Sequence, residues 1–296
     1  MGAGIFTITG IFSQLAKRGL VMIKDIIVNL GLGAKDPAGE FAISVADAFG
    51  AHLLGLAYSY DPVIPGMVMG GIPPQFIDSQ RAESDLKAGN AVSRFEASAK
   101  RAGISAETRT LNSSVSGAAD TFGRLARRFD LVMVGQTEAG QSMPDEVIDE
   151  AALFESGRPV VFVPYIQQAG LKLDRVMLCW DGSRAATRAI ADSLPFLQKA
   201  KQVEIVMIAG KADKGVEIAG VDLGQHLARH RLKVDVKRIT SVDIDVASTI
   251  LSHASDSNAD MIVMGGYGHS RLREFVLGGV TKSILDTMTV PVLMSH

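Results

Sequence analysis

The sequence predicts an α/β fold built from two repeated, doubly wound parallel-sheet domains with five strands each. Short apolar runs alternate with amphipathic stretches from Met22 onward, the pattern of strands covered by helices on both faces. Three of these runs recur in the same order in the two halves of the chain. A length of 296 residues is also about twice that of an ordinary domain.

The repeat lies in three pairs of matched segments. These pairs are Lys24–Leu30 with Asp174–Trp180, Asp130–Gly135 with Asp260–Gly265, and Arg158–Pro164 with Val290–Met294. Because all three keep their order, we interpret the chain as one unit written twice. The expected division is an N-terminal extension at 1–21, a first domain at 22–164, a polar linker at 165–171 and a second domain at 172–296.

The second half shows the alternation of strands and helices most clearly. Its expected strands are Val176–Trp180, Val203–Ala209, Lys233–Arg238, Met261–Met264 and Val290–Met294. Its expected helices are Ala185–Gln198, Ile218–His230, Val246–Ser255 and Val280–Met288. This order predicts a parallel sheet with helices on both faces.

The first half follows the same plan with one insertion. Residues 61–74 contain four prolines and three glycines, so we expect no helix there. A long charged helix is expected over Arg81–Ala102. The last strands of the two halves, Pro159–Val163 and Val290–Met294, are rich in valine and expected at sheet edges. Unpaired edges invite pairing, so we expect the halves to join there as an intramolecular pseudo-dimer.

Composition excludes several classes of protein. A net charge of −2 with a pI of about 6.3 argues against a nucleic-acid-binding surface. No apolar run reaches the ~18 residues of a membrane span. The apolar run Ile5–Phe12 is followed, not preceded, by Lys17 and Arg18, which is the reverse of a secretory signal. With one cysteine and no Cys/His cluster of zinc spacing, we expect a cytoplasmic protein without a structural metal.

Two loops of the second half lie where a doubly wound sheet binds its ligands, beyond the carboxyl ends of the strands. One presents Asp181 after the opening strand. The other follows the fourth strand and contains Gly265 and Gly268, and it ends at Gly278 and Gly279. Glycines let backbone N–H groups approach an anion closely, and a helix beginning near Val280 adds the positive end of its dipole. Tight turns and helix caps would explain the same glycines.

The segment from Met264 to Thr281 resembles the signature of the universal stress protein family, Gly-x2-Gly-x9-Gly followed by Ser or Thr. The resemblance covers nearly the whole chain from Met22 as a tandem of two family domains. It implies a Rossmann-like, adenine-nucleotide-binding fold and ATP, alone or with Mg²⁺, as the ligand. The residues it implies for binding are Asp181, Ile208, Met264, Gly265, Gly268, Gly278, Gly279 and Val280.

The chain departs from this signature at one position. The family's hydroxyl residue is replaced by Gly279, which removes one hydrogen bond to phosphate. Losing such a bond to a charged group costs about 1.5–3 kcal/mol, or about 10–150-fold in affinity. Arg271 in the same loop is expected to offset part of this loss.

The first half has lost more of the signature. Gly31 replaces the counterpart of Asp181, and Gln136-Thr137-Glu138-Ala139-Gly140 replaces the glycine loop. The carboxylates of Asp145, Glu146, Asp149 and Glu150 follow and would repel a phosphate. We expect no nucleotide in this half.

The resulting interpretation is an ATP-binding sensor or regulator of the stress response with its nucleotide in the second half. No residue is positioned by the sequence as a general base, so turnover beyond slow hydrolysis is not predicted. The alternatives are a nucleotide-free dimeric scaffold that acts through protein partners and an enzyme acting on a small adenylated substrate. Dimerisation of two chains stays open at this level.

Overall fold

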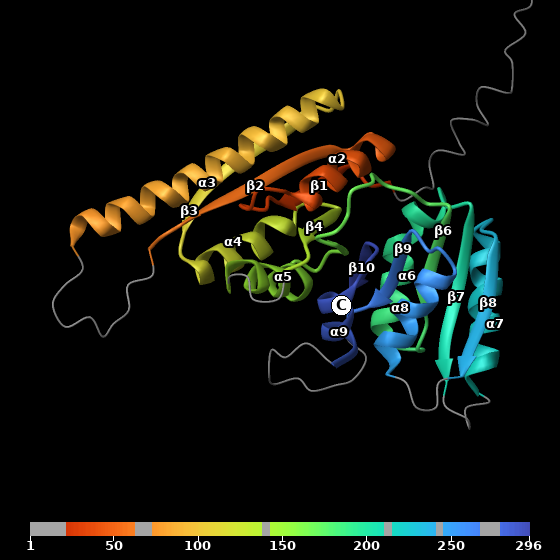
Figure 1. The fold of residues 1–296 in the computed structure, drawn as a ribbon. Helices are drawn as coiled ribbons and strands as arrows, with labels where there is room; N and C mark the ends of the chain where they lie inside the picture. Colours follow the sequence, from red (N-terminus) through yellow and green to blue (C-terminus); the bar gives the residue numbers. More distant parts are fainter. Residues whose placement is uncertain (1–21, 63–72, 138–142, 210–214, 241–244, 267–278) are drawn as a thin grey trace, which may run out of the picture.

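A ten-stranded sheet with helices on both faces organises the protein (Figure 1). The structure is a computed structural model, and it describes residues 22–62, 73–137, 143–209, 215–240, 245–266 and 279–296. The strand order is β3-β2-β1-β4-β5-β10-β9-β6-β7-β8. The order within the first five strands is therefore repeated in the second five, which confirms the duplication that the matched segments predicted.

Each half contributes five strands and four helices to the described part of the chain. The strands are β1 Asp25–Asn29, β2 His52–Tyr60, β3 Ala106–Ser113, β4 Leu131–Gly135, β5 Val160–Val163, β6 Arg175–Cys179, β7 Gln202–Ala209, β8 Val234–Thr240, β9 Met261–Gly265 and β10 Val292–Ser295. The helices are α2 Pro37–Phe49, α3 Pro74–Arg101, α4 Val115–Ala126, α5 Met143–Glu155, α6 Arg184–Leu197, α7 Gly215–Arg229, α8 Val246–Asp256 and α9 Gly279–Thr287.

Two hydrophobic cores cover the two faces of the sheet. On one face, α2, α3 and α6 contribute Phe41, Phe95 and Phe196. On the other, Phe122 of α4 and Ile284 of α9 pack with residues of α5 and α8. Strands with both faces buried explain why their sequences are continuous apolar runs and not alternating ones.

The halves join through their last strands. β5 and β10 pair antiparallel, with Val161 opposite Leu293, whereas every other ladder of the sheet is parallel. The expected pairing of the terminal strands is confirmed. Phe49 and Phe196 also meet edge to face across the junction, with ring centroids 5.1 Å apart. Because β5 and β10 run in opposite directions, the carboxyl ends of the first-half strands form one edge of the sheet and those of the second-half strands form the opposite edge.

Aspartates at matching positions of the repeat make similar hydrogen bonds between strands in the two halves. The Asp130 carboxylate accepts hydrogen bonds from the N–H groups of Lys24 and Asp25 at 2.8 and 3.1 Å. Its counterpart Asp260 accepts from the N–H of Arg175 at 2.9 Å. Each carboxylate precedes the fourth strand of its half and fixes the start of the first strand, so the sequence repeat extends to hydrogen bonding.

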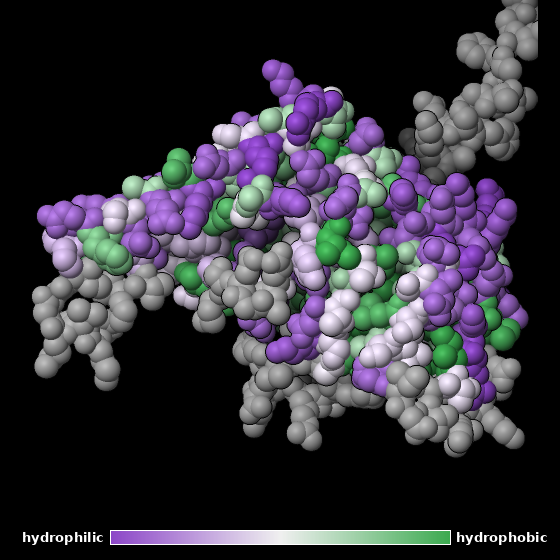
Figure 2. Space-filling model, viewed as in Figure 1, coloured by the Kyte–Doolittle hydropathy of each residue, from purple (hydrophilic) through white to green (hydrophobic). Residues whose placement is uncertain are grey.

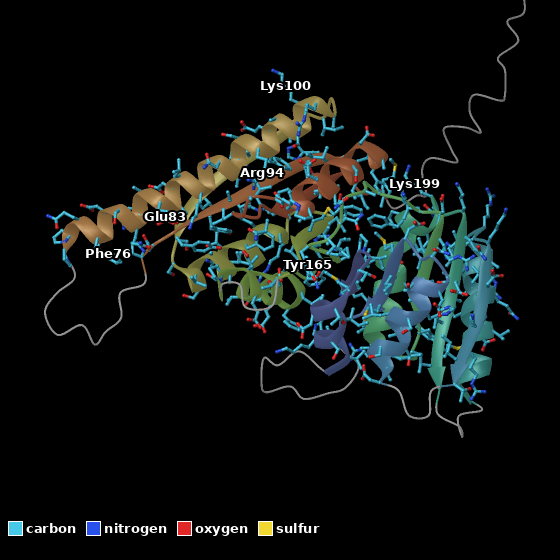
Figure 3. All side chains as sticks on the ribbon, in the orientation of Figure 1. Phe76, Glu83, Arg94, Lys100, Tyr165 and Lys199 are labelled. Atoms are coloured by element: carbon cyan, nitrogen blue, oxygen red, sulfur yellow. The ribbon has the colours of Figure 1, made fainter. Side chains whose placement is uncertain are left out.

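Helix α3 begins earlier than the sequence predicted. The expected start at Arg81 is wrong, because α3 begins at Pro74. Proline suits the first turn of a helix, where its missing N–H has no partner to lose. The first turns of α3 extend beyond the body of the molecule, with Phe76 near one end and Lys100 near the other (Figure 3). Hydrophilic residues cover most of its visible side (Figure 2), so apolar periodicity could not reveal this extension.

Candidate functional site

The expected site of the second half lies at the carboxyl ends of β6, β7 and β9. Helix α6 follows β6 on one face of the sheet, and α9 follows β9 on the other. β6 and β9 are neighbours in the sheet. The winding therefore reverses between these two strands, which is where open α/β sheets bind ligands.

Asp181 lies exposed in the turn between β6 and α6. One of its carboxylate oxygens accepts a hydrogen bond from the N–H of Ser183 at 2.9 Å. Ser183 in turn caps α6 by accepting from the N–H of Ala186 at 3.0 Å. Gly182 makes this tight turn with φ of +77°. The second carboxylate oxygen of Asp181 has no hydrogen bond to another described residue, so it is available to a ligand.

The side chains of Ile208 and Met264 pack into the core, so that only their backbones are available to a ligand. The Ile208 side chain is partly buried against the core of one face. The Met264 side chain is 6% exposed and belongs to the same core. Ile208 lies near the end of β7 and Met264 near the end of β9, so their peptide groups are close to the edge where a ligand would lie.

The packing of α6 explains why residue 265 is a glycine. A Cβ at this position would lie 2.6 Å from the backbone nitrogen of Ala186 and 2.9 Å from the Cβ of Ala185. The start of α6 thus packs directly on Gly265, whether or not a ligand binds. The next amide is also used internally, since the N–H of Gly266 donates to the carbonyl of Ser295 at 2.8 Å. An anion nest at this edge cannot include the Gly266 amide.

Gly279 and Val280 begin α9 at the same edge. Gly279 is exposed, and a Cβ there would meet no atom of another described residue within 4 Å. The Thr281 hydroxyl donates to the carbonyl of Gly266 at 3.3 Å, which fixes the start of α9 over the end of β9. The structure therefore joins the glycine after β9 to the start of α9 through a hydrogen bond that the sequence did not indicate.

Three expected residues of this loop cannot be located. Gly268, Arg271 and Gly278 lie outside the described residues. The described part of the site consists of Asp181, Ile208, Met264, Gly265, Gly279 and Val280.

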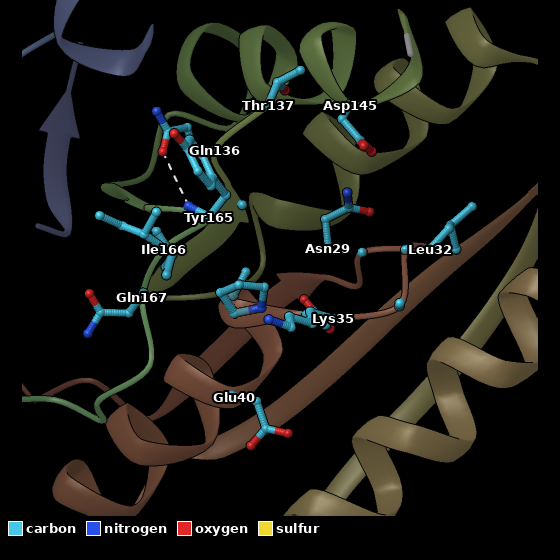
Figure 4. Close-up of a pocket in the computed structure, with 18 of the residues that line it drawn as sticks. Asn29, Leu32, Lys35, Glu40, Gln136, Thr137, Asp145, Tyr165, Ile166 and Gln167 are labelled. Atoms are coloured by element: carbon cyan, nitrogen blue, oxygen red, sulfur yellow. Dashed lines mark hydrogen bonds between the residues drawn. The ribbon is translucent and has the colours of Figure 1, made fainter. Parts of the chain in front are cut away.

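The matching edge of the first half contains a cavity of about 940 Å³ that the sequence analysis did not predict. It opens at the carboxyl ends of β1, β4 and β5, where Asn29, Gly135 and Val163 line it (Figure 4). Seven residues, 30–36, join β1 to α2, whereas four, 180–183, join β6 to α6. The longer loop lines the cavity, and its length is the sequence signal that was available.

Buried carboxyl groups line this cavity. Burial raises the pKa of Asp36 to about 6, although hydrogen bonds from the N–H groups of Gly39 and Gly31 act in the opposite direction. Burial also raises the pKa of Asp145, and burial together with the Asp145 charge raises the pKa of Asp149 well above its usual value. Two of the four carboxylates that the sequence placed here thus reach the cavity.

Among the described residues there is neither a metal-binding group of side chains nor a membrane-spanning helix. In these ranges, no three His, Cys, Asp or Glu side chains are grouped so as to hold a metal ion. None of the described helices combines the length and apolar character that a bilayer crossing requires.

Comparisons with known sequences agree with this architecture. Residues 172–296 match the model of the universal stress protein family. Universal stress protein Slr1230 of Synechocystis is 30% identical over 84 residues, which are 28% of this chain and 24% of that protein. The chain thus spans about a quarter of the length of this relative.

Solved structures resemble the whole described fold. A universal stress protein from Archaeoglobus fulgidus superposes with a TM-score of 0.68 at 18% identity, covering 90% of this chain and 97% of that one. A functionally unknown protein from Pseudomonas aeruginosa gives a TM-score of 0.57 at 12% identity, with 92% of each chain covered. At such identities the likeness shows the fold alone.

Proposed function

Because residues 172–296 match the universal stress protein family, we propose that the chain binds ATP in its second half and acts as a stress-response sensor or regulator. The observation that carries this proposal is the switch point between β6 and β9, where exposed Asp181 and the start of α9 lie at one edge. Such an edge supplies a hydrogen-bond acceptor and backbone N–H donors to the same ligand.

The residues present fit a nucleotide in two respects. The free oxygen of Asp181 is able to accept a hydrogen bond from the ribose or the base. Gly279 leaves open the space that a side chain would fill, so its N–H and that of Val280 are accessible to phosphate oxygens. In this proposal the backbone of Ile208 holds the adenosine, and Gly265, Gly268 and Gly278 complete the phosphate loop.

Several finer statements belong to the same proposal. Mg²⁺ would accompany the phosphates as their counter-ion. A cytoplasmic location agrees with the single cysteine. Slow hydrolysis is the most turnover that we expect, since none of the described site residues is a general base in contact with the others.

The test is thermal unfolding of the full chain with and without Mg-ATP. At 100 times Kd, bound nucleotide stabilises by about 2.7 kcal/mol, which corresponds to a rise in Tm of roughly 5 °C. Trp180 is the one tryptophan of the chain and neighbours Asp181, so its fluorescence gives a second readout.

Asp181→Asn is the informative variant. Asn keeps an acceptor for the Ser183 N–H but loses the charge, so we expect ATP affinity to fall about tenfold without loss of folding. Asp256→Asn is the matched control, because Asp256 is exposed at the end of α8, next to the amino end of β9. Equal ATP affinity in wild type and Asp181→Asn would contradict the proposed role of Asp181.

A nucleotide-free scaffold is the second candidate. The missing hydroxyl at Gly279 and the internal use of the Gly266 amide both favour it. No change in Tm or in fluorescence at millimolar ATP would select this candidate over the first.

A further inference from the structure

The first-half cavity has the size of a site for a small organic molecule. Pockets of about 300–1,000 Å³ hold such ligands, and this one measures about 940 Å³. A metal ion would leave most of that space empty. The question is therefore which class of organic ligand its lining fits.

One side of the cavity is balanced in charge. The Arg94 guanidinium donates from Nη2 to the carbonyl of Gly31 at 2.8 Å, and its charge lowers the pKa of Asp36. Lys35 lies in the same loop and also lines the cavity. Arg94 of α3 thus lies next to the carboxylate of the β1–α2 loop, on the side of the cavity that Lys35 also lines.

The opposite side, formed by α5, carries carboxyl groups that are not paired with a cation. Asp145 and Asp149 both line the cavity, and neither forms an ion pair with a described residue. The Thr137 hydroxyl donates to Asp149 at 3.0 Å. Glu146 and Glu150 act on Asp149 in the same direction as Asp145 and raise its pKa further. This side attracts a cation and repels a phosphate.

A buried amide without a partner lies between these groups. The Asn29 side chain lines the cavity, although the residue is only 8% exposed. It forms no hydrogen bond with a described residue. In Figure 4 it extends from the end of β1 into the space below Asp145. The oxygen and nitrogen of this amide are therefore available to hydrogen-bond with a ligand in the cavity.

Two exposed apolar side chains lie at the rim of the cavity. Tyr165 and Ile166 are 48% and 49% exposed, and both line the cavity on the side away from Asp145 (Figure 4). Exposed side chains of this size next to a cavity suit the apolar part of a ligand.

We propose that the first-half cavity binds a small organic amine with an apolar body. The ammonium group lies among Asp145, Asp149 and Asn29, which together offer carboxylate and amide oxygens as acceptors. The apolar body lies against Tyr165 and Ile166. This proposal is independent of ATP in the second half, since none of these residues belongs to that site.

Calorimetric titration of the full chain with 2-phenylethylamine tests the proposal. Neutral 2-phenylethanol and anionic phenylacetate have the same ring and differ in the charge of the polar end. We expect the amine to bind at least about tenfold more tightly than the alcohol, and the acid not to bind. Equal binding of amine and alcohol, binding of the acid, or no heat with millimolar amine would each overturn the proposal.

Two variants assign the binding to the cavity. Asp145→Asn and Asp149→Asn keep the shape and remove the charge, and each should lower amine affinity at least about tenfold. Asp120→Asn is the control, because Asp120 pairs with Arg124 on the exposed side of α4 and should bind the amine as the wild type does. If Asp149→Asn does not fold, Asp145→Asn decides alone. Unchanged affinity in Asp145→Asn, or displacement of the amine by ATP, would sink the assignment.

Discussion

The two halves share a strand order and a sheet yet differ at the edge where each would bind a ligand. In the first half, a seven-residue loop after β1 and the carboxyl groups of α5 surround a cavity. In the second, a four-residue turn contains the exposed Asp181, and α9 begins at Gly279. Duplication thus preserved the core, where packing constrains every residue, and let the loops diverge in length and charge.

Matching glycines give the strongest contrast between the halves. Gly135 and Gly265 end corresponding strands, but among the described residues a Cβ on Gly135 would meet only Ala38, at 3.7 Å, which is an ordinary contact. A Cβ on Gly265 would clash with the backbone of α6. We predict that Gly265→Ala lowers the free energy of unfolding by about 3 kcal/mol, while Gly135→Ala changes it by less than about 1 kcal/mol. Urea denaturation of both variants measures this, and equal midpoints would break the contrast.

Helix caps at matching positions differ in charge, which predicts a pH effect confined to the first half. Asp36 caps α2 by accepting from the N–H of Gly39, and burial raises the pKa of Asp36 to about 6. A raised pKa means that the folded state binds the proton more tightly than the unfolded state. The contribution of Asp36 to stability therefore falls as pH rises from about 4 to about 6, by up to about 3 kcal/mol.

The measurement is the free energy of unfolding of wild type and Asp36→Asn between pH 4 and pH 8. Asn keeps the cap and cannot ionise, so the variant should be more stable than wild type above pH 6 and nearly equal to it at pH 4. A difference that does not change with pH would show that the Asp36 carboxyl titrates normally.

Replacing the uncharged cap of the second half should lower the free energy of unfolding by an amount that does not depend on pH. Ser183 accepts from the N–H of Ala186 at 3.0 Å and has no buried charge to relieve. We predict that Ser183→Ala lowers the free energy of unfolding by about 1 kcal/mol. The same pH series applied to this variant should give a constant difference from wild type, and stabilisation at any pH would be inconsistent with a cap.

The fold was largely predictable because buried parallel strands leave an unmistakable pattern. Apolar runs such as Val203–Ala209 predicted strands to within a residue or two, and the valine-rich ends predicted the β5–β10 pairing. The start of α3 was missed because its first turns are exposed and carry no apolar period.

The sites were less predictable because they depend on contacts between distant segments. Arg94 reaches Gly31 across 63 positions of sequence to form one wall of the first-half cavity. The packing of α6 on Gly265 likewise assigned a structural role to a glycine that the family signature explains by its ligand. Signatures identify loops, but only coordinates separate the demands of packing from those of binding.

Helices α9 and α5 each contact the opposite half of the molecule. The start of α9, at Gly279, lies at the second-half edge, while the carbonyl of Leu285 near its other end accepts a hydrogen bond of 2.8 Å from Gln136 in the wall of the first-half cavity. In return, Leu153 of α5 packs so closely on Gly266 that a Cβ there would lie 3.0 Å from it. Helix α9, which is about 13 Å long, therefore links the carboxyl ends of the strands in the two halves. A substitution that shifts α9 or α5 would therefore also disturb the strand ends of the other half.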